Sequence, residues 1–470
     1  MLTISAHLYI AAAHKSSGKT SVSVGLAAAL AKRGLAVQPF KKGPDYIDPL
    51  WLGRAAGRAC YNLDFFTMSH AEMLATFAGR GTAADISLVE GNKGLFDGLD
   101  VEGMDSNAAL AKLLSAPVVL VIDTNGMTRG IAPLISGYLD FDRDVDIRGV
   151  ILNKVGGKRH EGKLRAALER YTDTEVLGAI GRDQALEIPE RHLGLVPANE
   201  AKMADTTIAR LADAVSAGID VDRLIEIADA GKTPVTEGRS IAKPTKLDPD
   251  VRIAIARDAA FGFYYQDDLE AFARAGAELI PFDALSDAKL PEADGLFIGG
   301  GFPETHLEAL SANKSLLDDI RQALARGMPA YAECGGLMYL ARSIEWRSEK
   351  FNMVGAVPGE VIVEHRPQGR GYVLLEETGK RLWPPAPHGR QSASAEIPAH
   401  EFHYARLVNL SGDLKFAHRV LRGHGIDGQH DGLLIGNLQA GFVHHRNTDA
   451  DPWVHRFVEF VREKSAQVRT

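Results

Sequence analysis

A short stretch near the amino terminus restricts the fold of this chain more than any other. Residues 1–10 read as a first strand, residues 11–20 read AAAHKSSGKT, and a helical pattern follows from Ser21 to Lys32. Strand, loop and helix in this order are the context of a phosphate-binding loop of the G-x-x-x-x-G-K-T type, although Ala13 takes the place of the first glycine. We therefore expect an ATP-binding loop at the start of an α/β domain.

The loop offers the groups that phosphate binding requires. Backbone N–H groups of Ser16, Ser17 and Gly18 can surround the phosphates. Lys19 supplies positive charge to the outer phosphates, and Thr20 offers a hydroxyl to Mg²⁺. A Gly-Lys-Thr sequence alone could equally form an ordinary helix cap, but the preceding strand favours ATP binding.

Further apolar runs indicate a sheet covered by helices on both faces. Residues 117–124 and 149–154 are nearly continuous apolar strands, which is typical of buried parallel strands. Helical patterns at 107–114 and 162–170 alternate with them. The alternation predicts a doubly wound, mainly parallel sheet with ligands at the carboxyl ends of its strands. Asn153 lies at such an end, and we expect it to help recognise the nucleotide base.

Acidic side chains also occur at the predicted strand ends. Glu90 ends an apolar run that starts after residue 85, which is the place of a Mg²⁺-binding carboxylate beside a phosphate-binding loop. Asp45 and Asp48 stand next to two lysines, an arrangement that is costly unless a cation lies between the carboxylates. Mg²⁺ and an ATP-activated acid would provide this, and a charged surface loop is the alternative. Asp97 lies on the glycine-rich loop beyond Glu90.

A second strand–turn–helix unit carries a nucleophile. Residues 330–340 read AYAECGGLMYL, so a small apolar strand ends at Cys334 and two glycines precede a helical pattern. This is the arrangement of a nucleophile elbow, in which the helix dipole favours a thiolate and the N–H of Gly335 can donate to an oxyanion. Gly300 and Gly301, after another strand, can complete the oxyanion hole. A lone cysteine is commonly a buried structural residue, but the two glycines favour a catalytic thiol.

A base for this thiol is expected far along the chain. His444 and His445 follow the apolar run 440–443, and we assign His444 as the base. Neighbouring side chains of a strand point to opposite faces, so only one of the two can face the thiol. Glu401 and His403 share a strand face by the same rule, and neither is assigned as the base.

These motifs resemble one protein family. GGGFPE at 299–304, AECGGLMYL at 332–340 and AHEFHYARL at 399–407 are similar to the glutamine amidotransferase half of the cobyrinate a,c-diamide synthase family. GPDYIDP at 43–49 and EGNKGLFDG at 90–98 are similar to its synthetase half. The resemblance implies that ATP activates a carboxylate, that Cys334 releases ammonia from glutamine, and that ammonia forms an amide on the a and c acetates of a corrinoid, in cobalamin biosynthesis. It places Asp45, Asp48 and Asp97 in substrate activation, with Mg²⁺ on Thr20 and Glu90.

Length and composition agree with such an enzyme. The 470 residues suffice for an ATP-binding amidoligase domain at 1–232, a proline-containing charged linker at 233–250 and a glutamine amidotransferase domain at 251–470. A net charge of −8 argues against nucleic-acid or anionic-membrane binding, and two cysteines fit a reducing cytoplasm. No apolar run reaches the roughly 18 residues of a membrane helix. The expected partners are ATP, glutamine and a polycarboxylate tetrapyrrole; the oligomeric state stays open, with a homodimer as one option.

Three alternatives remain at this point. The same chemistry could act on hydrogenobyrinate or a sirohaem-type ring, because corrinoid members usually carry His-x-His where this chain has His444 and His445 side by side. A non-catalytic P-loop partitioning or binding protein would not explain Cys334 with its glycine loop. A cysteine hydrolase would not need the ATP half. The stretch 188–196 matches the family as well, but the role of its His192 is not evident.

Overall fold

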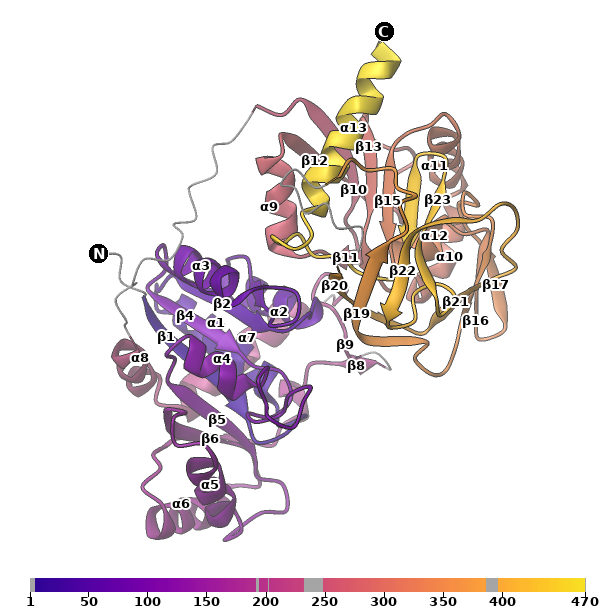
Figure 1. The fold of residues 1–470 in the computed structure, drawn as a ribbon. Helices are drawn as coiled ribbons and strands as arrows, with labels where there is room; N and C mark the ends of the chain where they lie inside the picture. The colour runs from indigo at the N-terminus through magenta and orange to yellow at the C-terminus, as the bar shows by residue number, and fades with distance from the viewer. Residues whose placement is uncertain (1–4, 192–193, 202, 232–247, 386–395, 470) are drawn as a thin grey trace. The chain divides into compact units, whose positions relative to one another are not determined.

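The chain folds into two compact units. The computed structural model describes residues 5–191, 194–201, 203–231, 248–385 and 396–469. The units comprise Met1–Ile241 and Ala242–Thr470, and Figure 1 shows both. The predicted linker 233–250 lies outside the described residues except for its last three positions, and His192 lies outside them as well.

The first unit is built on a parallel sheet. Its described residues form seven strands in the order β3-β2-β4-β1-β5-β6-β7, and every pairing is parallel. The strands are β1 (Ala6–Ala12), β2 (Val37–Lys42), β3 (Tyr61–Leu63), β4 (Ile86–Glu90), β5 (Val118–Asp123), β6 (Ile147–Val155) and β7 (Val176–Gly181). The predicted parallel sheet is therefore confirmed.

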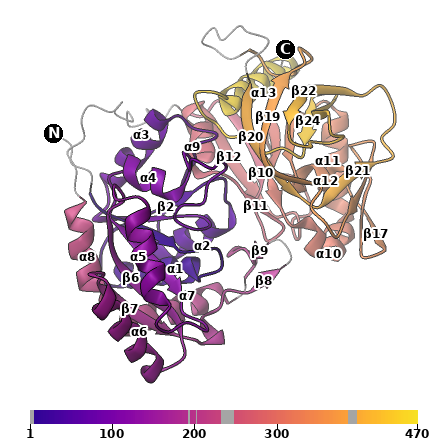
Figure 2. The same ribbon diagram turned by 60° about the horizontal axis from the view of Figure 1, so that its bottom comes forward.

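Helices cover both faces of this sheet (Figure 2). Alternate residues of β1 point to opposite faces: Leu8 and Ile10 join one apolar core, and Tyr9 and Ala11 join the other. The first core includes α1 (Lys19–Lys32), α2 (Ile47–Ala56), α7 (Ala204–Gly218) and α8 (Val221–Ala230). The second includes α3 (His70–Gly81), α4 (Asn107–Leu113), α5 (Ile131–Phe141) and α6 (Lys158–Tyr171).

The second unit contains a mixed sheet. Over the described residues its strand order is β12-β10-β13-β15-β24-β23-β22-β19-β20. The first five strands pair in parallel, and the pairings from β24 onward are antiparallel. The strands are β10 (Val251–Ala256), β12 (Ala277–Phe282), β13 (Gly295–Ile298), β15 (Ala330–Glu333), β19 (Gly369–Glu377), β20 (Ile397–His403), β22 (Lys415–Arg422), β23 (His430–Ile435) and β24 (Leu438–Gly441). The longest of these strands, β19, has nine residues.

Two helical layers also enclose this sheet. Helices α10 (Leu307–Ala312), α11 (Lys314–Ala325) and α12 (Gly335–Leu340) pack on one face, and α9 (Gln266–Arg274) and α13 (Trp453–Arg469) pack on the other. The small strands β11 (Phe261–Phe263) and β14 (Gly300–Gly301) pair with each other, and β16 (Ser343–Trp346), β17 (Glu349–Asn352), β18 (Glu360–Val363) and β21 (Ala405–Val408) form a separate sheet. None of the helices within the described ranges has the length and apolar character to traverse a bilayer.

Candidate active site

The predicted nucleophile elbow is present in the second unit. Strand β15 ends at Glu333, α12 begins at Gly335, and Cys334 between them has φ 48° and ψ −104°. Residues other than glycine rarely adopt a positive φ, because this backbone conformation is strained. Such strained residues cluster at functional turns. Cys334 is buried in the turn, with 6% of its surface exposed.

The glycine loop lies directly against this elbow. Strand β13 pairs with β15 in parallel and leads into the loop that contains Gly300 and Gly301. A Cβ atom on Gly335 would lie 3.1 Å from the N atom of Gly301, and one on Gly336 would lie 2.1 Å from the carbonyl oxygen of Ile298. Side chains are therefore excluded where the two loops meet, and backbone N–H groups can approach a substrate oxygen. The oxyanion role of Gly300, Gly301 and Gly335 stays a prediction.

His444 lies beside Cys334. Strand β24 (Leu438–Gly441) pairs with β15, so the strand lies two residues earlier than the predicted apolar run 440–443. His444 follows in a short loop that bridges to His400. The imidazole forms a side-chain hydrogen bond with Cys334. Burial opposes the charged ring, but Cys334 and Glu333 outweigh it and raise the pKa of His444 to about 10. The ring is therefore suited to stabilise a thiolate as an imidazolium near neutral pH.

His445 has a different partner. Its Nδ1 atom lies 2.6 Å from Oδ2 of Asp451, and both side chains are buried. Burial opposes its charged form, but Asp451 raises the pKa of His445 above its ordinary value. The two neighbouring histidines thus contact different groups, as expected from the sequence.

We expect His444→Ala to slow alkylation of Cys334 by iodoacetamide near pH 7, because less thiolate would be present. Glutaminase turnover should fall by roughly 10²-fold or more, the usual scale for loss of a general base. Ammonia-driven amidation should survive. His445→Ala should behave nearly as the wild type in the thiol assay. Exchanged behaviour of the two variants would identify His445 as the base.

Glu401 and His403 do share a strand face, and they hold a loop in place. Oε1 of Glu401 accepts a hydrogen bond from the N–H of His424 at 2.7 Å, and Oε2 accepts one from Gly425 at 2.9 Å. Nε2 of His403 lies 3.4 Å from Oε2 of Glu401, and Nδ1 donates to the carbonyl oxygen of Ala405 at 2.7 Å. These contacts give the polar atoms of both buried side chains hydrogen-bond partners.

The phosphate-binding loop of the first unit has the expected position. It follows β1, and α1 begins at Lys19 directly after Gly18, which has φ 81°. Asn153 Nδ2 donates to the carbonyl oxygen of Ser17 at 2.8 Å, and Lys154 Nζ donates to that of Ser16 at 2.9 Å. The end of β6 therefore supports this loop. Base recognition by Asn153 stays a prediction, and the structure shows its amide in contact with the loop.

Carboxylates converge next to this loop, and that of Glu90 is fully buried. Thr20 Oγ1 donates to Oε1 of Glu90 at 2.8 Å and lies 3.2 Å from Oδ2 of Asp48. Lys19 Nζ lies 3.5 Å from Oε1 of Glu90. Lys41 Nζ lies 2.5 Å from Oδ2 of Asp48 and 3.0 Å from Oε1 of Glu90. The sequence predicted a cation between the acidic groups and assigned it to Mg²⁺; in the structure the ammonium of Lys41 fills this place.

The carboxylates of the cluster differ in electrostatic character. Burial disfavours the charge of Asp48, but Lys41 outweighs it and lowers the pKa of Asp48. Burial and the neighbouring Asp48 raise the pKa of Asp45 to about 7. Oδ1 of Asp45 accepts hydrogen bonds from the N–H groups of Ile47 and Asp48 at the start of α2, at 2.9 and 3.0 Å. Asp45 therefore positions the charged Asp48.

Two further observations concern the predicted metal. Oε2 of Glu90 is buried and has no hydrogen-bond partner among the described residues. A buried carboxylate oxygen normally has a partner, so this atom is available to bind a cation. The described ranges contain no group of three His, Cys, Asp or Glu side chains that could hold a metal ion by themselves. Mg²⁺ commonly takes one or two carboxylates and completes its shell with phosphates and water, so Glu90 and Thr20 fit it.

Asp97 supports the glycine-rich loop. Its Oδ2 atom accepts a hydrogen bond from the N–H of Gly94 at 2.9 Å. A Cβ atom on Gly94 would lie 2.6 Å from the carbonyl oxygen of Ala13, so this loop contacts the phosphate-binding loop. Asn107, which the sequence did not single out, donates to the carbonyl oxygen of Gly94 at 2.6 Å. Its one signal in the sequence was a polar residue at the start of a helical pattern.

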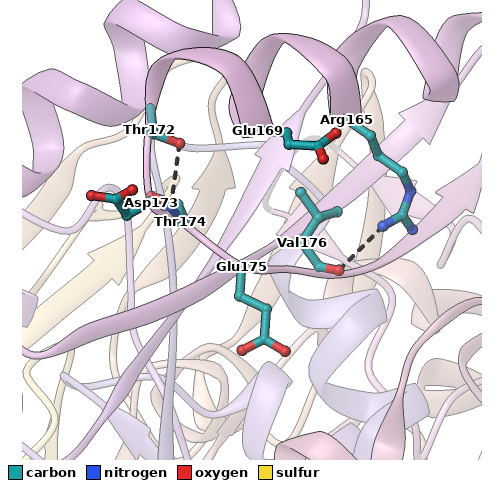
Figure 3. A pocket seen from close by; sticks show the side chains of 7 residues that line it. All are labelled: Arg165, Glu169, Thr172, Asp173, Thr174, Glu175 and Val176. Atoms are coloured by element: carbon teal, nitrogen blue, oxygen red, sulfur yellow. Dashed lines mark hydrogen bonds between the residues drawn. The ribbon is translucent and has the colours of Figure 1, made fainter.

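A pocket elsewhere in the first unit has no part in this site. It is lined by Arg165, Glu169, Thr172, Asp173, Thr174, Glu175 and Val176, which Figure 3 shows. Val176 begins β7, so the pocket lies at the amino end of a parallel strand, whereas the phosphate-binding loop lies at a carboxyl end. Nη1 of Arg165 donates a hydrogen bond to the carbonyl oxygen of Val176 at 3.2 Å, so part of the guanidinium is already paired within the pocket wall.

The fold and the site define the class of protein. One unit joins a phosphate-binding loop to buried carboxylates, and the other joins an elbow cysteine to a histidine and a glycine loop, so the chain combines a nucleotide-dependent domain with a glutamine amidotransferase. Residues 8–196 match the CobQ/CobB/MinD/ParA nucleotide binding domain, and residues 252–451 match the CobB/CobQ-like glutamine amidotransferase domain. The chain belongs to the cobyrinate a,c-diamide synthase family and is a glutamine-dependent, ATP-using amidating enzyme.

Its relatives match over nearly their whole length. The cobyrinate a,c-diamide synthase of Magnetococcus marinus is 45% identical over 98% of this chain and 98% of its own. That of Methanosarcina acetivorans is 41% identical over 93% of this chain and 91% of its own, and that of Archaeoglobus fulgidus is 40% identical over 97% of each.

Proposed function

We propose that this enzyme converts cobyrinate to cobyrinate a,c-diamide by amidating its a and c acetate side chains with ATP and glutamine. The observation that carries the proposal is the presence in one chain of the Cys334–His444 pair and the Lys19–Glu90 cluster, with full-length likeness to cobyrinate a,c-diamide synthases. A carboxylate is a poor acyl donor, so amidation needs both an activating half and an ammonia-producing half.

The glutaminase half supplies ammonia. The sulfur of Cys334 attacks the side-chain carbonyl of glutamine, and the N–H groups of the glycine loop and Gly335 stabilise the oxyanion. His444 receives the thiol proton and passes it to the departing nitrogen, so ammonia leaves and a thioester remains. Water then hydrolyses the thioester, which releases glutamate and regenerates the thiol.

The synthetase half activates the substrate. The terminal phosphoryl group of ATP passes to an oxygen of the acetate, giving an acyl phosphate and ADP. Lys19 neutralises charge on the phosphates, and Mg²⁺, held by Thr20 and Glu90, would supply further stabilisation of that charge. Ammonia then attacks the acyl carbon, the C–N bond forms, and inorganic phosphate leaves. Asp45 and Asp48 shape this region through Lys41, and Asp97 does so through the glycine-rich loop.

The macrocycle is the part of the proposal that a direct experiment must test. Purified enzyme is incubated with ATP, Mg²⁺ and glutamine and, in separate samples, with cobyrinate, hydrogenobyrinate and sirohaem-type rings. Mass spectrometry detects each replacement of OH by NH₂. We expect two such replacements on cobyrinate. Diamide formation on another ring, with none on cobyrinate, would contradict the substrate while leaving the chemistry intact.

The cellular location follows from the same chemistry. ATP and glutamine are metabolites of the cytoplasm, and both cysteines, Cys60 and Cys334, are free thiols, as expected in a reducing compartment. We place the enzyme in the cytoplasm on these grounds.

A further inference from the structure

A catalytic histidine paired with a nucleophile commonly needs a third group that orients it. The residues that follow His444 do not provide this group. His445 is paired with Asp451 at 2.6 Å, and the buried guanidinium of Arg446 lies 3.0 Å from Oδ2 of Asp267. A different part of the chain must therefore position the imidazole.

A buried glutamate faces the ring of His444 from the strand that carries the nucleophile. Oε2 of Glu333 lies 3.5 Å from Nδ1 of His444, and the side chains are 4% and 3% exposed. This separation is longer than a formed N–H···O bond. Catalytic hydrogen bonds are often long without substrate and tighten in the reacting complex. The contact to Nδ1 leaves Nε2 as the ring nitrogen for Cys334.

The carboxylate of Glu333 is itself held in place. Its Oε1 atom accepts hydrogen bonds from the hydroxyl of Tyr331 at 2.6 Å and from the N–H of His445 at 3.0 Å. Tyr331 and Glu333 are two residues apart on β15 and so share a face. Tyr331 stacks on Phe297 with ring centroids 5.6 Å apart, which fixes the donor. The second oxygen of Glu333 is thereby directed toward His444.

The other ring beside His444 does not supply a charge. His400 stacks on His444 with centroids 5.0 Å apart and an interplanar angle of 17°. Burial, and then the positive charges of His444 and Arg446, lower the pKa of His400 well below its ordinary value. His400 is therefore a neutral neighbour, and it does not compete for the proton of His444.

We propose that Glu333, the residue immediately before the nucleophile, is the positioning residue of the glutaminase site and fixes the imidazole of His444 in the tautomer that accepts the thiol proton. This inference rests on the proposed roles of Cys334 and His444. It assigns the third group of the site to the strand before the elbow rather than to a residue after the histidine.

The test is Glu333→Gln in the full-length enzyme. Glutamine keeps an acceptor oxygen for Tyr331 and His445 but presents an NH₂ group to Nδ1 of His444, so the ring proton moves to Nε2 and the ring can no longer receive the thiol proton. We expect kcat with glutamine to fall by about 10²-fold or more, with little change in KM. Alkylation of Cys334 by iodoacetamide near pH 7 should slow, and ammonium-driven amidation should remain.

The matched control is Glu349→Gln, the same change at an exposed position of β17 in the same unit, which should leave every rate unchanged. If E333Q does not accumulate as folded protein, Glu333→Asp replaces it. Asp keeps the charge but shortens the side chain, and it should lower glutamine turnover while ammonium-driven amidation persists. Wild-type glutamine kcat and alkylation rate in E333Q, or in Glu333→Asp where that replaces it, would overturn the positioning role. Loss of glutamine use in Cys334→Ser alone would then show that the nucleophile assignment still stands.

Discussion

Cys334→Ser is expected to remove glutamine-dependent amidation, with a loss of about 10⁴-fold or more, the scale seen when a covalent nucleophile is removed. A hydroxyl is much less acidic than a thiol, so His444 cannot hold it as the anion that attacks glutamine. Amidation with a high concentration of ammonium salt should continue, because the thiol serves only to produce ammonia. Production of the amide is measured with each nitrogen source.

The chain offers a matched control for this change. Cys60 is also a buried free cysteine, but it lies in the first unit, and burial raises its pKa well above the ordinary value, which keeps the thiol neutral. Cys60→Ser should therefore retain glutamine-dependent amidation. Unimpaired glutamine use in Cys334→Ser would remove the nucleophile assignment.

Lys19→Ala and Glu90→Gln are expected to disable amidation with both glutamine and ammonia. Lys19 is the proposed partner of the ATP phosphates, and Glu90 contacts Lys19, Thr20 and Lys41. Both changes should therefore act on the ATP step, before nitrogen enters. Loss of one preorganised group that stabilises developing charge typically costs about 10²-fold or more. Release of ADP in the presence of cobyrinate and ammonia is the measurement.

Lys32→Ala is the control for Lys19→Ala. Lys32 lies at the other end of α1, where it pairs with Asp213 at 2.9 Å on the surface, and its removal should leave ADP release unchanged. Near wild-type ADP release in Lys19→Ala or in Glu90→Gln would exclude that residue from the ATP site. Glutaminase activity of the second unit serves in each case as evidence that the protein is folded.

The parts of this enzyme that the sequence predicted are those set by local chemistry. Both strand–loop–helix units could be located from short motifs. Gly-Lys-Thr after a strand marks the phosphate-binding loop, and Cys-Gly-Gly after a strand marks the nucleophile elbow. The parallel character of the first sheet, though not the order of its strands, also followed from apolar runs that alternate with helices. The assignment of His444 depended on its position after an apolar run, although the strand ends earlier, at Gly441.

The parts that sequence reasoning missed depend on contacts between distant segments. The carboxylate of Glu333 reaches His444 only because β15 and β24 are neighbours, and nothing in either stretch alone indicates this pairing. Lys41 contacts Glu90 because β2 and β4 are adjacent strands. The cation between the acidic side chains is therefore a lysine of this chain, which the sequence did not indicate. The antiparallel half of the second sheet lacks a strict alternation of helices and strands, so the sequence did not predict β19 or its pairing with β20 and β22.

The coupling of the two halves is tested most directly with glutamine labelled with ¹⁵N in its side-chain amide. The enzyme, ATP, Mg²⁺, cobyrinate and unlabelled ammonium at low concentration are combined, and the product is analysed by mass spectrometry together with the ADP formed. We predict that both new amides carry ¹⁵N and that one ADP appears for each amide. Product without ¹⁵N, or amide formed without ADP, would contradict the account.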